Sequence, residues 1–218
     1  EEATMNDEVM RMRRPVTVRA WVVGTALASL LGAASAQTPY RVQIFPLAHT
    51  VGGLLPKAIN EKGHVAGIAS SVDGIHAVVL KDGMIEDHGL GTPEAINERG
   101  QMAGSKPDWR GRPRAARWGA LGSMIISRSG MNSAALGIND RGEAAGFTRV
   151  DEAPFPVPYV TRWSLGEATT YGLGMAYAID NLGRIAGFHL PGPNDPMQAA
   201  TWSAGAMTLL GAPGSWAM

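Results

Sequence analysis

The residues with the most evident binding chemistry form a basic cluster around one tryptophan. The cluster comprises Lys106, Trp109, Arg110, Arg112, Arg114 and Arg117. An indole stacks on guanidinium groups, and arginines pair with carboxylates and phosphates through two parallel hydrogen bonds. The cluster is therefore able to contact an acidic sugar or a surface phosphate. The candidate contacts are Trp109, Arg110, Arg112 and Arg114. Charge runs by themselves favour the other interpretation, an exposed charged loop that only keeps the protein soluble.

The other titratable residues form no recognisable catalytic or metal-binding pattern. The sequence contains no Gly-x-Ser-x-Gly, His-Glu-x-x-His, phosphate loop or Gly-x-Gly-x-x-Gly. The carboxylate pairs Glu86-Asp87 and Asp151-Glu152 could serve a glycosidase, but adjacent residues of a strand point apart. The histidines, which show no ligand spacing, are His49, His64, His76, His88 and His189. We therefore expect no enzymatic activity, no metal site and no cofactor.

A ten-residue motif occurs in four copies and organises the rest of the chain. The copies span residues 58–67, 95–104, 137–146 and 178–187. Their isoleucines, Ile59, Ile96, Ile138 and Ile179, are 37, 42 and 41 residues apart. Spacings near 40 residues are typical of stacked supersecondary units.

Each copy reads as two short strands joined by a tight turn. Asn or Asp opens the turn because its side chain bonds nearby backbone, and Gly closes it by accepting positive φ. The predicted turn residues are Asn60, Gly63, Asn97, Gly100, Asn139, Gly142, Asp180 and Gly183. A calcium loop would need several alternating carboxylates, whereas three of these turns contain Lys or Arg. We therefore expect a turn and not a calcium loop. A strand follows each turn, and the Ala-Gly pair that recurs in it indicates the close approach of another backbone.

A third segment in each unit has a small apolar second residue and a bulky fifth residue. The segments are residues 76–80, 114–118, 159–163 and 198–202, and three of them end in Trp118, Trp163 and Trp202. These positions face opposite sides of a strand, so we expect the bulky side of one unit to pack on the small side of the next. With a fourth segment, often ending in Leu-Gly, each unit would have four strands. This predicts an all-β protein built as a β-propeller or a propeller-like array of four four-stranded blades, either as an incomplete ring or as a closed one.

The recurring Ile-Asn-x-x-Gly-x-x-Ala-Gly, the segments His76-Ala77-Val78-Val79-Leu80 and Gln198-Ala199-Ala200-Thr201-Trp202, and the Leu-Gly exits resemble the HAF family of extracellular repeat proteins. The resemblance covers residue 40 to the end. The His-Ala-Phe triplet survives only as His76-Ala77-Val78, and the second unit lacks a Leu-Gly exit. The resemblance implies an exported bacterial repeat protein, and it provides no catalytic residue to carry over.

The first 36 residues have the three parts of a secretory signal peptide, preceded by a short polar extension. Basic residues 11–14 come before an apolar run of 13 residues, 20–32, and an Ala-x-Ala site ends at Ala36. The run is shorter than the ~20 residues that span a bilayer, which favours cleavage over anchoring. We expect cleavage after Ala36, secretion to the periplasm, medium or cell surface, and no membrane span in the mature chain.

The expected repeat domain covers residues 37–218 and its charge is balanced. Its units span about 55–91, 92–131, 132–174 and 175–211, with partial strands at 40–47 and 215–218. The partial strands could pair to close a ring, or the repeats could continue in a longer protein. Removing residues 1–36 takes away four of the 19 acidic and four of the 19 basic residues, which leaves 15 of each. This balance argues against nucleic-acid binding.

Two insertions, residues 105–114 and 149–158, are expected as loops between the second and third strands of their units. Equivalent loops would gather on one face of the array, where repeat proteins bind. We therefore expect an exported, noncatalytic scaffold that binds a surface polysaccharide or a protein. The alternatives are a polysaccharide-acting glycosidase or lyase with a site built from loops of several blades, and a structural segment of a larger surface protein. The sequence leaves the oligomeric state open.

Overall fold

The structure is a computed structural model that describes residues 52–128, 131–149, 157–192, 195–211 and 214. Within these ranges the chain forms fifteen strands and no helix, which confirms the predicted all-β class. Several sequence predictions fall outside the described residues: the signal peptide, the partial strands 40–47 and 215–218, and residues 150–156 of the second insertion.

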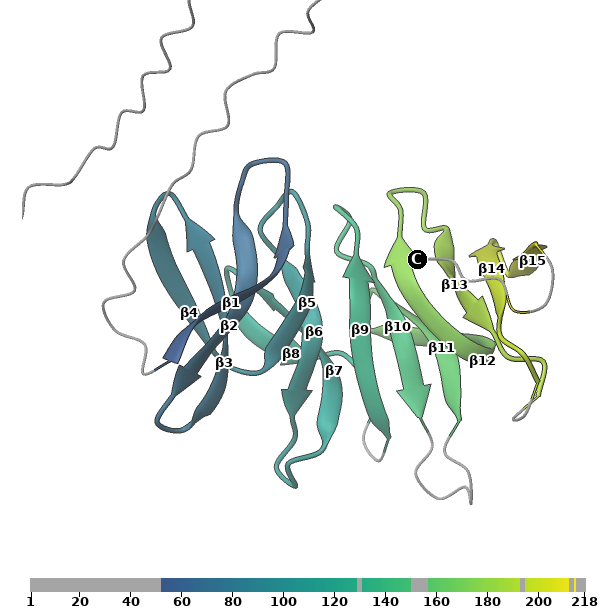
Figure 1. Ribbon diagram of the computed structural model, residues 1–218, viewed down its shortest axis with the longest axis horizontal. Helices are drawn as coiled ribbons and strands as arrows, with labels where there is room; N and C mark the ends of the chain where they lie inside the picture. The colour runs from purple at the N-terminus through teal and green to yellow at the C-terminus, as the bar shows by residue number, and fades with distance from the viewer. Residues whose placement is uncertain (1–51, 129–130, 150–156, 193–194, 212–213, 215–218) are drawn as a thin grey trace, which may run out of the picture. The chain divides into compact units, whose positions relative to one another are not determined.

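The strands form three antiparallel sheets, in which neighbours in sequence are neighbours in space (Figure 1). The first sheet contains β1 (Gly52–Ile59), β2 (Val65–Ser71), β3 (Gly74–Lys81) and β4 (Met84–Leu90). The second contains β5 (Thr92–Ile96), β6 (Met102–Pro107), β7 (Pro113–Gly119) and β8 (Gly122–Ile125). The third contains β9 (Asn132–Ile138), β10 (Ala144–Arg149), β11 (Pro158–Ser164), β12 (Glu167–Ile179), β13 (Ile185–His189), β14 (Gln198–Ser203) and β15 (Ala206–Leu210).

The long strand β12 serves two groups of strands. Its residues up to Leu173 pair with β11, and its residues from Gly174 onward pair with β13. The third sheet is therefore two four-stranded meanders that share one continuous strand. We call β1–β4 unit 1, β5–β8 unit 2, β9–β11 with residues 167–173 unit 3, and residues 174–179 with β13–β15 unit 4. Sequence analysis expected separate units on either side of this point.

The four copies of the repeated motif form the turns between the first two strands of each unit. In unit 2 the carbonyl of Asn97 accepts the N–H of Gly100 at 3.0 Å, and the Asn97 Oδ1 accepts the N–H groups of Arg99 and Gln101 at 3.0 and 2.8 Å. Gly100 has φ +74°, in the left-handed region that side chains with a Cβ resist. The corresponding glycines Gly63, Gly142 and Gly183 have φ +78°, +79° and +80°.

A β-bulge lies opposite each recurring Ala-Gly pair. In unit 2 the register shifts between Pro93 and Ala95, which face Gly104 and Ala103. The bulge brings the Thr92 carbonyl so close to Gly104 that a Cβ there would overlap it. This close approach of a backbone confirms the role predicted for the small residues.

The core lies between consecutive units and is centred on three buried indoles. Trp118 of unit 2 packs with Ala66 and Ala77 of unit 1. The two equivalent clusters place Trp163 against Ala103 and Ala115, and Trp202 against Ala145 and Val160. The predicted packing of a bulky side on a small side is therefore confirmed, but each bulky side faces the preceding unit and not the next one. At ~25 cal/mol per Å² and ~150–250 Å² per aromatic side chain, each indole contributes about 4–6 kcal/mol of transfer free energy.

Two rows of hydrogen bonds also link the turns of consecutive units. In the first row, side-chain Nδ2 atoms of Asn60, Asn97 and Asn139 donate to the backbone carbonyls of Asn97, Asn139 and Asp180 at 2.9, 2.8 and 2.8 Å. In the second row, backbone N–H groups of Glu61, Glu98 and Asp140 donate to side-chain oxygens of Glu98, Asp140 and Asn181 at 2.8, 2.9 and 2.8 Å. Sequence analysis assigned Asn only to its own turn. The structure adds a role in joining neighbouring units.

Candidate binding site

The insertion at residues 105–114 is a short hairpin and not the loop that the sequence predicts. Strand β6 continues to Pro107 and β7 begins at Pro113, so only five residues lie between the strands. The turn repeats the geometry of the Asn turns: the Asp108 carbonyl accepts the N–H of Gly111 at 2.8 Å. The Asp108 Oδ1 accepts the N–H groups of Arg110 and Arg112 at 2.8 and 3.0 Å. The Asp-x-x-Gly spacing could have indicated this turn from the sequence.

This turn holds Trp109 and Arg110 toward solvent. Trp109 is 83% exposed, and the Cζ atom of Arg110 lies 4.3 Å from the centroid of its ring. By contrast, Trp118, Trp163 and Trp202 are at most 3% exposed. The pair therefore presents a flat apolar ring and a guanidinium group together, an arrangement that can stack on a sugar ring and pair with its carboxylate.

The other members of the basic cluster do not join this pair. Arg114 is 4% exposed, and it donates to the Ser127 carbonyl at 3.0 Å and to the Ser127 Oγ at 3.3 Å. Lys106 donates to the Ser123 Oγ at 2.6 Å, and Arg117 donates to the carbonyl of Gly142 in unit 3 at 2.8 Å. The structure thus brings together Trp109, Arg110 and Arg112 at one turn and places Arg114 beneath it. Charge alone suggested exposure for Arg114, but its place in β7 directs it inward.

Asp108 ties the hairpin together electrostatically. Burial raises the pKa of its carboxyl, but the N–H groups of Arg112 and Arg110 and the charge of Arg112 outweigh this effect and lower the pKa. The Nε of Arg112 and the Nη1 of Arg114 each lie 3.5 Å from the Asp108 Oδ2. The carboxylate therefore partly neutralises Arg112 and Arg114, and Arg110 is left as the most outward cation of the turn.

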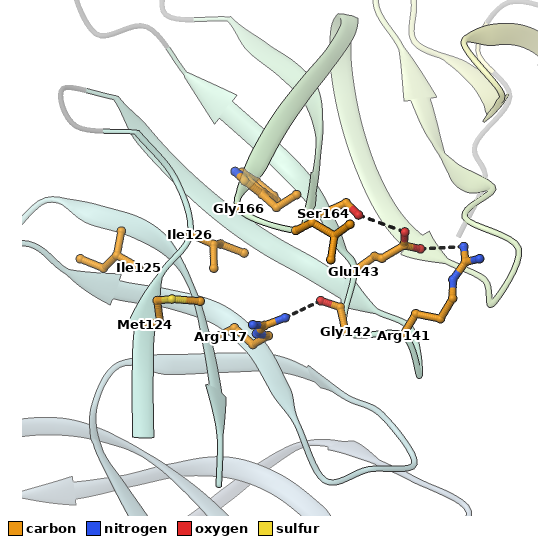
Figure 2. Close-up of a pocket in the computed structure, with 11 residues that line it drawn as sticks. Arg117, Met124, Ile125, Ile126, Arg141, Gly142, Glu143, Ser164 and Gly166 are labelled. Atoms are coloured by element: carbon orange, nitrogen blue, oxygen red, sulfur yellow. Dashed lines mark hydrogen bonds and ion pairs between the residues drawn. The ribbon is translucent and has the colours of Figure 1, made fainter. Parts of the chain in front are cut away.

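A pocket of about 540 Å³ lies between units 2 and 3 (Figure 2). Glu143 lines it and accepts hydrogen bonds from Arg162 at 2.6 Å, Arg141 at 2.8 Å and Ser164 at 3.1 Å. Burial raises the pKa of Glu143, but bonds from Asn139 and these arginines prevail and lower it to about 2. The apolar lining is Met124, Ile125, Ile126, Trp163 and Leu165. The charged groups bind the protein itself, which favours a structural role. The missing Leu-Gly exit of the second unit was the available sequence signal for this pocket.

A histidine lies between two carboxylates in unit 1. His76 Nε2 is 2.9 Å from the Asp73 Oδ1, and its Nδ1 is 2.8 Å from the Asp87 Oδ2. The bond to Asp87 raises the pKa of His76, although burial opposes this effect. His88 Nε2 lies 3.8 Å from the Glu86 Oε2, so Glu86 and Asp87 point to different partners, as expected for adjacent strand residues. This network joins β3 to β4.

In the part of the chain that the structure describes, no group of three or more His, Asp or Glu side chains is arranged to hold a metal ion. No helix in that part is long and apolar enough to cross a bilayer. Comparison of the chain with protein-family models and with curated proteins finds no match.

Proposed function

We propose that the chain is an exported, noncatalytic β-propeller or propeller-like repeat protein of HAF type. We further propose that it binds an acidic surface polysaccharide through the turn Asp108–Gly111. The observation that carries the binding role is the 83% exposure of Trp109 with Arg110 stacked on its ring. Exposure of the apolar indole ring to water costs free energy. That free energy is recovered when a flat ligand covers the ring.

The four meanders support the scaffold part of this proposal. Each pair of consecutive units buries an indole against alanines or valine of its neighbour, and rows of hydrogen bonds join their turns. Stacking of this kind gives a rigid body on which turns keep fixed positions. In a propeller these meanders would be the blades, and the signal sequence would carry the array out of the cytoplasm.

The hairpin supports the binding part because its conformation is preformed. The Asp108 carboxylate fixes the backbone of Arg110 and Arg112 before any ligand is present. Little conformational entropy is then lost when a ligand binds, since the turn does not have to become ordered. The proposed contacts are Trp109, Arg110 and Arg112. Arg114 holds the hairpin from beneath.

The test is titration of the 218-residue chain with polygalacturonate as the acidic polymer and dextran as the neutral one. We expect binding of polygalacturonate alone, weakened at least about tenfold by Trp109→Ala or by Arg110→Ser with Arg112→Ser, because stacking and ion pairing each contribute about 1–2 kcal/mol. Lys81→Ser, at an exposed position at the end of β3, is the matched control for lost charge and should bind normally.

Thermal melting of each variant separates lost binding from lost folding. Unchanged affinity in the Trp109 and arginine variants would remove this turn from the site. Release of new reducing ends from polygalacturonate would instead support the alternative of a polysaccharide-acting enzyme.

A further inference from the structure

On the bulky side of unit 1 Val78 is buried, but Ile59, Val65 and Leu80 are less covered than their counterparts in the other units. Ile59 is 67% exposed, whereas its counterparts Ile138 and Ile179 are 8% and 9% exposed. Leu80 pairs with Val65 where the inner units pair a tryptophan with Met102, Ala144 or Ile185. Leu80 and Val65 are only partly buried, while Trp118 and Met102 are fully buried.

Unit 4 presents the opposite kind of side. A hollow of about 360 Å³ opens beside Ala178, Ala186 and Thr201. Ala186 corresponds to Ala66, which receives the Trp118 indole at the boundary between units 1 and 2. The small side of unit 4 therefore has the chemistry that accepts a bulky side, and the bulky side of unit 1 is its counterpart.

The second row of hydrogen bonds can continue from unit 4 to a further unit 1. Each donor in this row is the backbone N–H that follows a turn Asn, and each acceptor is the side chain at the same position in the next unit. The N–H of Asn181 is the next donor of the series. Glu61, an exposed carboxylate, is the equivalent acceptor of a unit 1.

The first row cannot continue in the same way. In units 1 to 3 the side-chain amides of Asn60, Asn97 and Asn139 donate a hydrogen bond to the next unit, but the equivalent residue of unit 4 is Asp180. The Asp180 carboxylate accepts from the Nε of Arg184 at 2.6 Å and has no N–H to donate. A junction beyond unit 4 would therefore lack one bond that each inner boundary has.

We propose that the chain associates head to tail with a second copy of itself, the small side of unit 4 receiving the bulky side of the partner's unit 1. A second copy is the occupant because it carries the counterparts at this register: Ile59, Val65 and Leu80 for the hollow, and Glu61 for the Asn181 N–H. The contact is heterologous, so it builds closed rings or open chains. The missing Asp180 bond makes it weaker than an inner boundary.

The test uses the full 218-residue chain in sedimentation velocity over a wide range of protein concentration. Ile59→Arg blocks the bulky side and Ala178→Arg blocks the small side. At the inner boundary a Cβ added at Gly137, the counterpart of Ala178, would lie 3.0 Å from the Ala178 Cα, so an arginine there leaves no room. Both mutated positions are exposed, so folding should survive, and circular dichroism melting checks this.

Wild type should associate more as its concentration rises, and each single variant alone should be monomeric. An equimolar mixture of the two variants should form a heterodimer, because each retains the side that the other has lost. The double variant should stay monomeric alone and in every mixture. A monomeric wild type, an associating double variant, or a mixture that stays monomeric would each overturn the proposal.

Asp180→Asn provides a test of the register. It restores the amide donor of the first row and should lower the dissociation constant about tenfold, as expected for one added hydrogen bond. Wild type is the matched reference, since Asp180 accepts the same turn N–H groups of Leu182 and Arg184 without offering an amide donor. Equal affinity of the Asn variant and wild type would contradict the head-to-tail register.

Discussion

Two turns at opposite ends of β6 have the same local geometry and different surroundings. In both the Asn97 and the Asp108 turn, a side-chain oxygen accepts two backbone N–H groups, and the closing glycine has φ +74° or +76°. Asn97 is 5% exposed and bonds the Asn139 carbonyl of the next unit, whereas Trp109 of the second turn is 83% exposed. The local sequence sets the turn, and the neighbouring unit decides whether that turn joins units or is exposed to solvent.

The largest effect should come from removing the side chain that opens the covered turn. Asn97→Ala loses four hydrogen bonds, two of which come from the buried amide nitrogen. At roughly 1 kcal/mol per bond, and with a buried carbonyl left unpaired, we expect the free energy of unfolding to fall by about 4–5 kcal/mol. Asp108→Ala should lower the free energy of unfolding less. Urea denaturation measures both, and equal losses would mean that the neighbouring unit adds nothing.

A smaller effect should follow acid titration of Glu143, which directly follows the covered turn of unit 3. Its pKa of about 2 lies below the ordinary 4.5, so its stabilisation is complete above pH 4.5 and is lost as the pH falls through 2. Glu143→Gln should cost on the order of 2 kcal/mol at neutral pH, and the gap should close in acid. Unfolding free energies of both proteins from pH 7 to about 2 give the measurement. Glu167→Gln, at an exposed position of β12, is the control.

The smallest effect should separate the closing glycines of a covered and an exposed turn. Gly142 and Gly111 have φ +79° and +76°, so valine strains either backbone by about 1–2 kcal/mol. A Cβ at Gly142 would also lie 3.0 Å from the Arg117 Nη1, while nothing lies within 4 Å of one at Gly111. Gly142→Val should therefore melt at a lower temperature than Gly111→Val. The reverse order, or an unchanged melting temperature for Gly142→Val, would contradict this assignment.

Sequence reasoning predicted what depends on residue type and period. Strand alternation and repeat spacing predict that Trp118, Trp163 and Trp202 pack on the small sides of neighbouring units, and the structure shows that these are the preceding units. It was wrong about the insertion at residues 105–114, where Asp-x-x-Gly forms a tight hairpin. It also included the buried Arg114 among the ligand contacts. The signal peptide and the domain limits remain predictions.

The sequence by itself determined the all-β class and the positions of the repeated turns, because both follow from local backbone preferences and from a period that can be counted. Only the tertiary structure decided which groups meet between units. The amide of Asn97 bonds a carbonyl 42 residues away, and a hollow lies beside Ala186, whereas its counterpart Ala66 packs with Trp118. These outcomes depend on the distance and orientation between neighbouring units, which a period in the sequence does not specify.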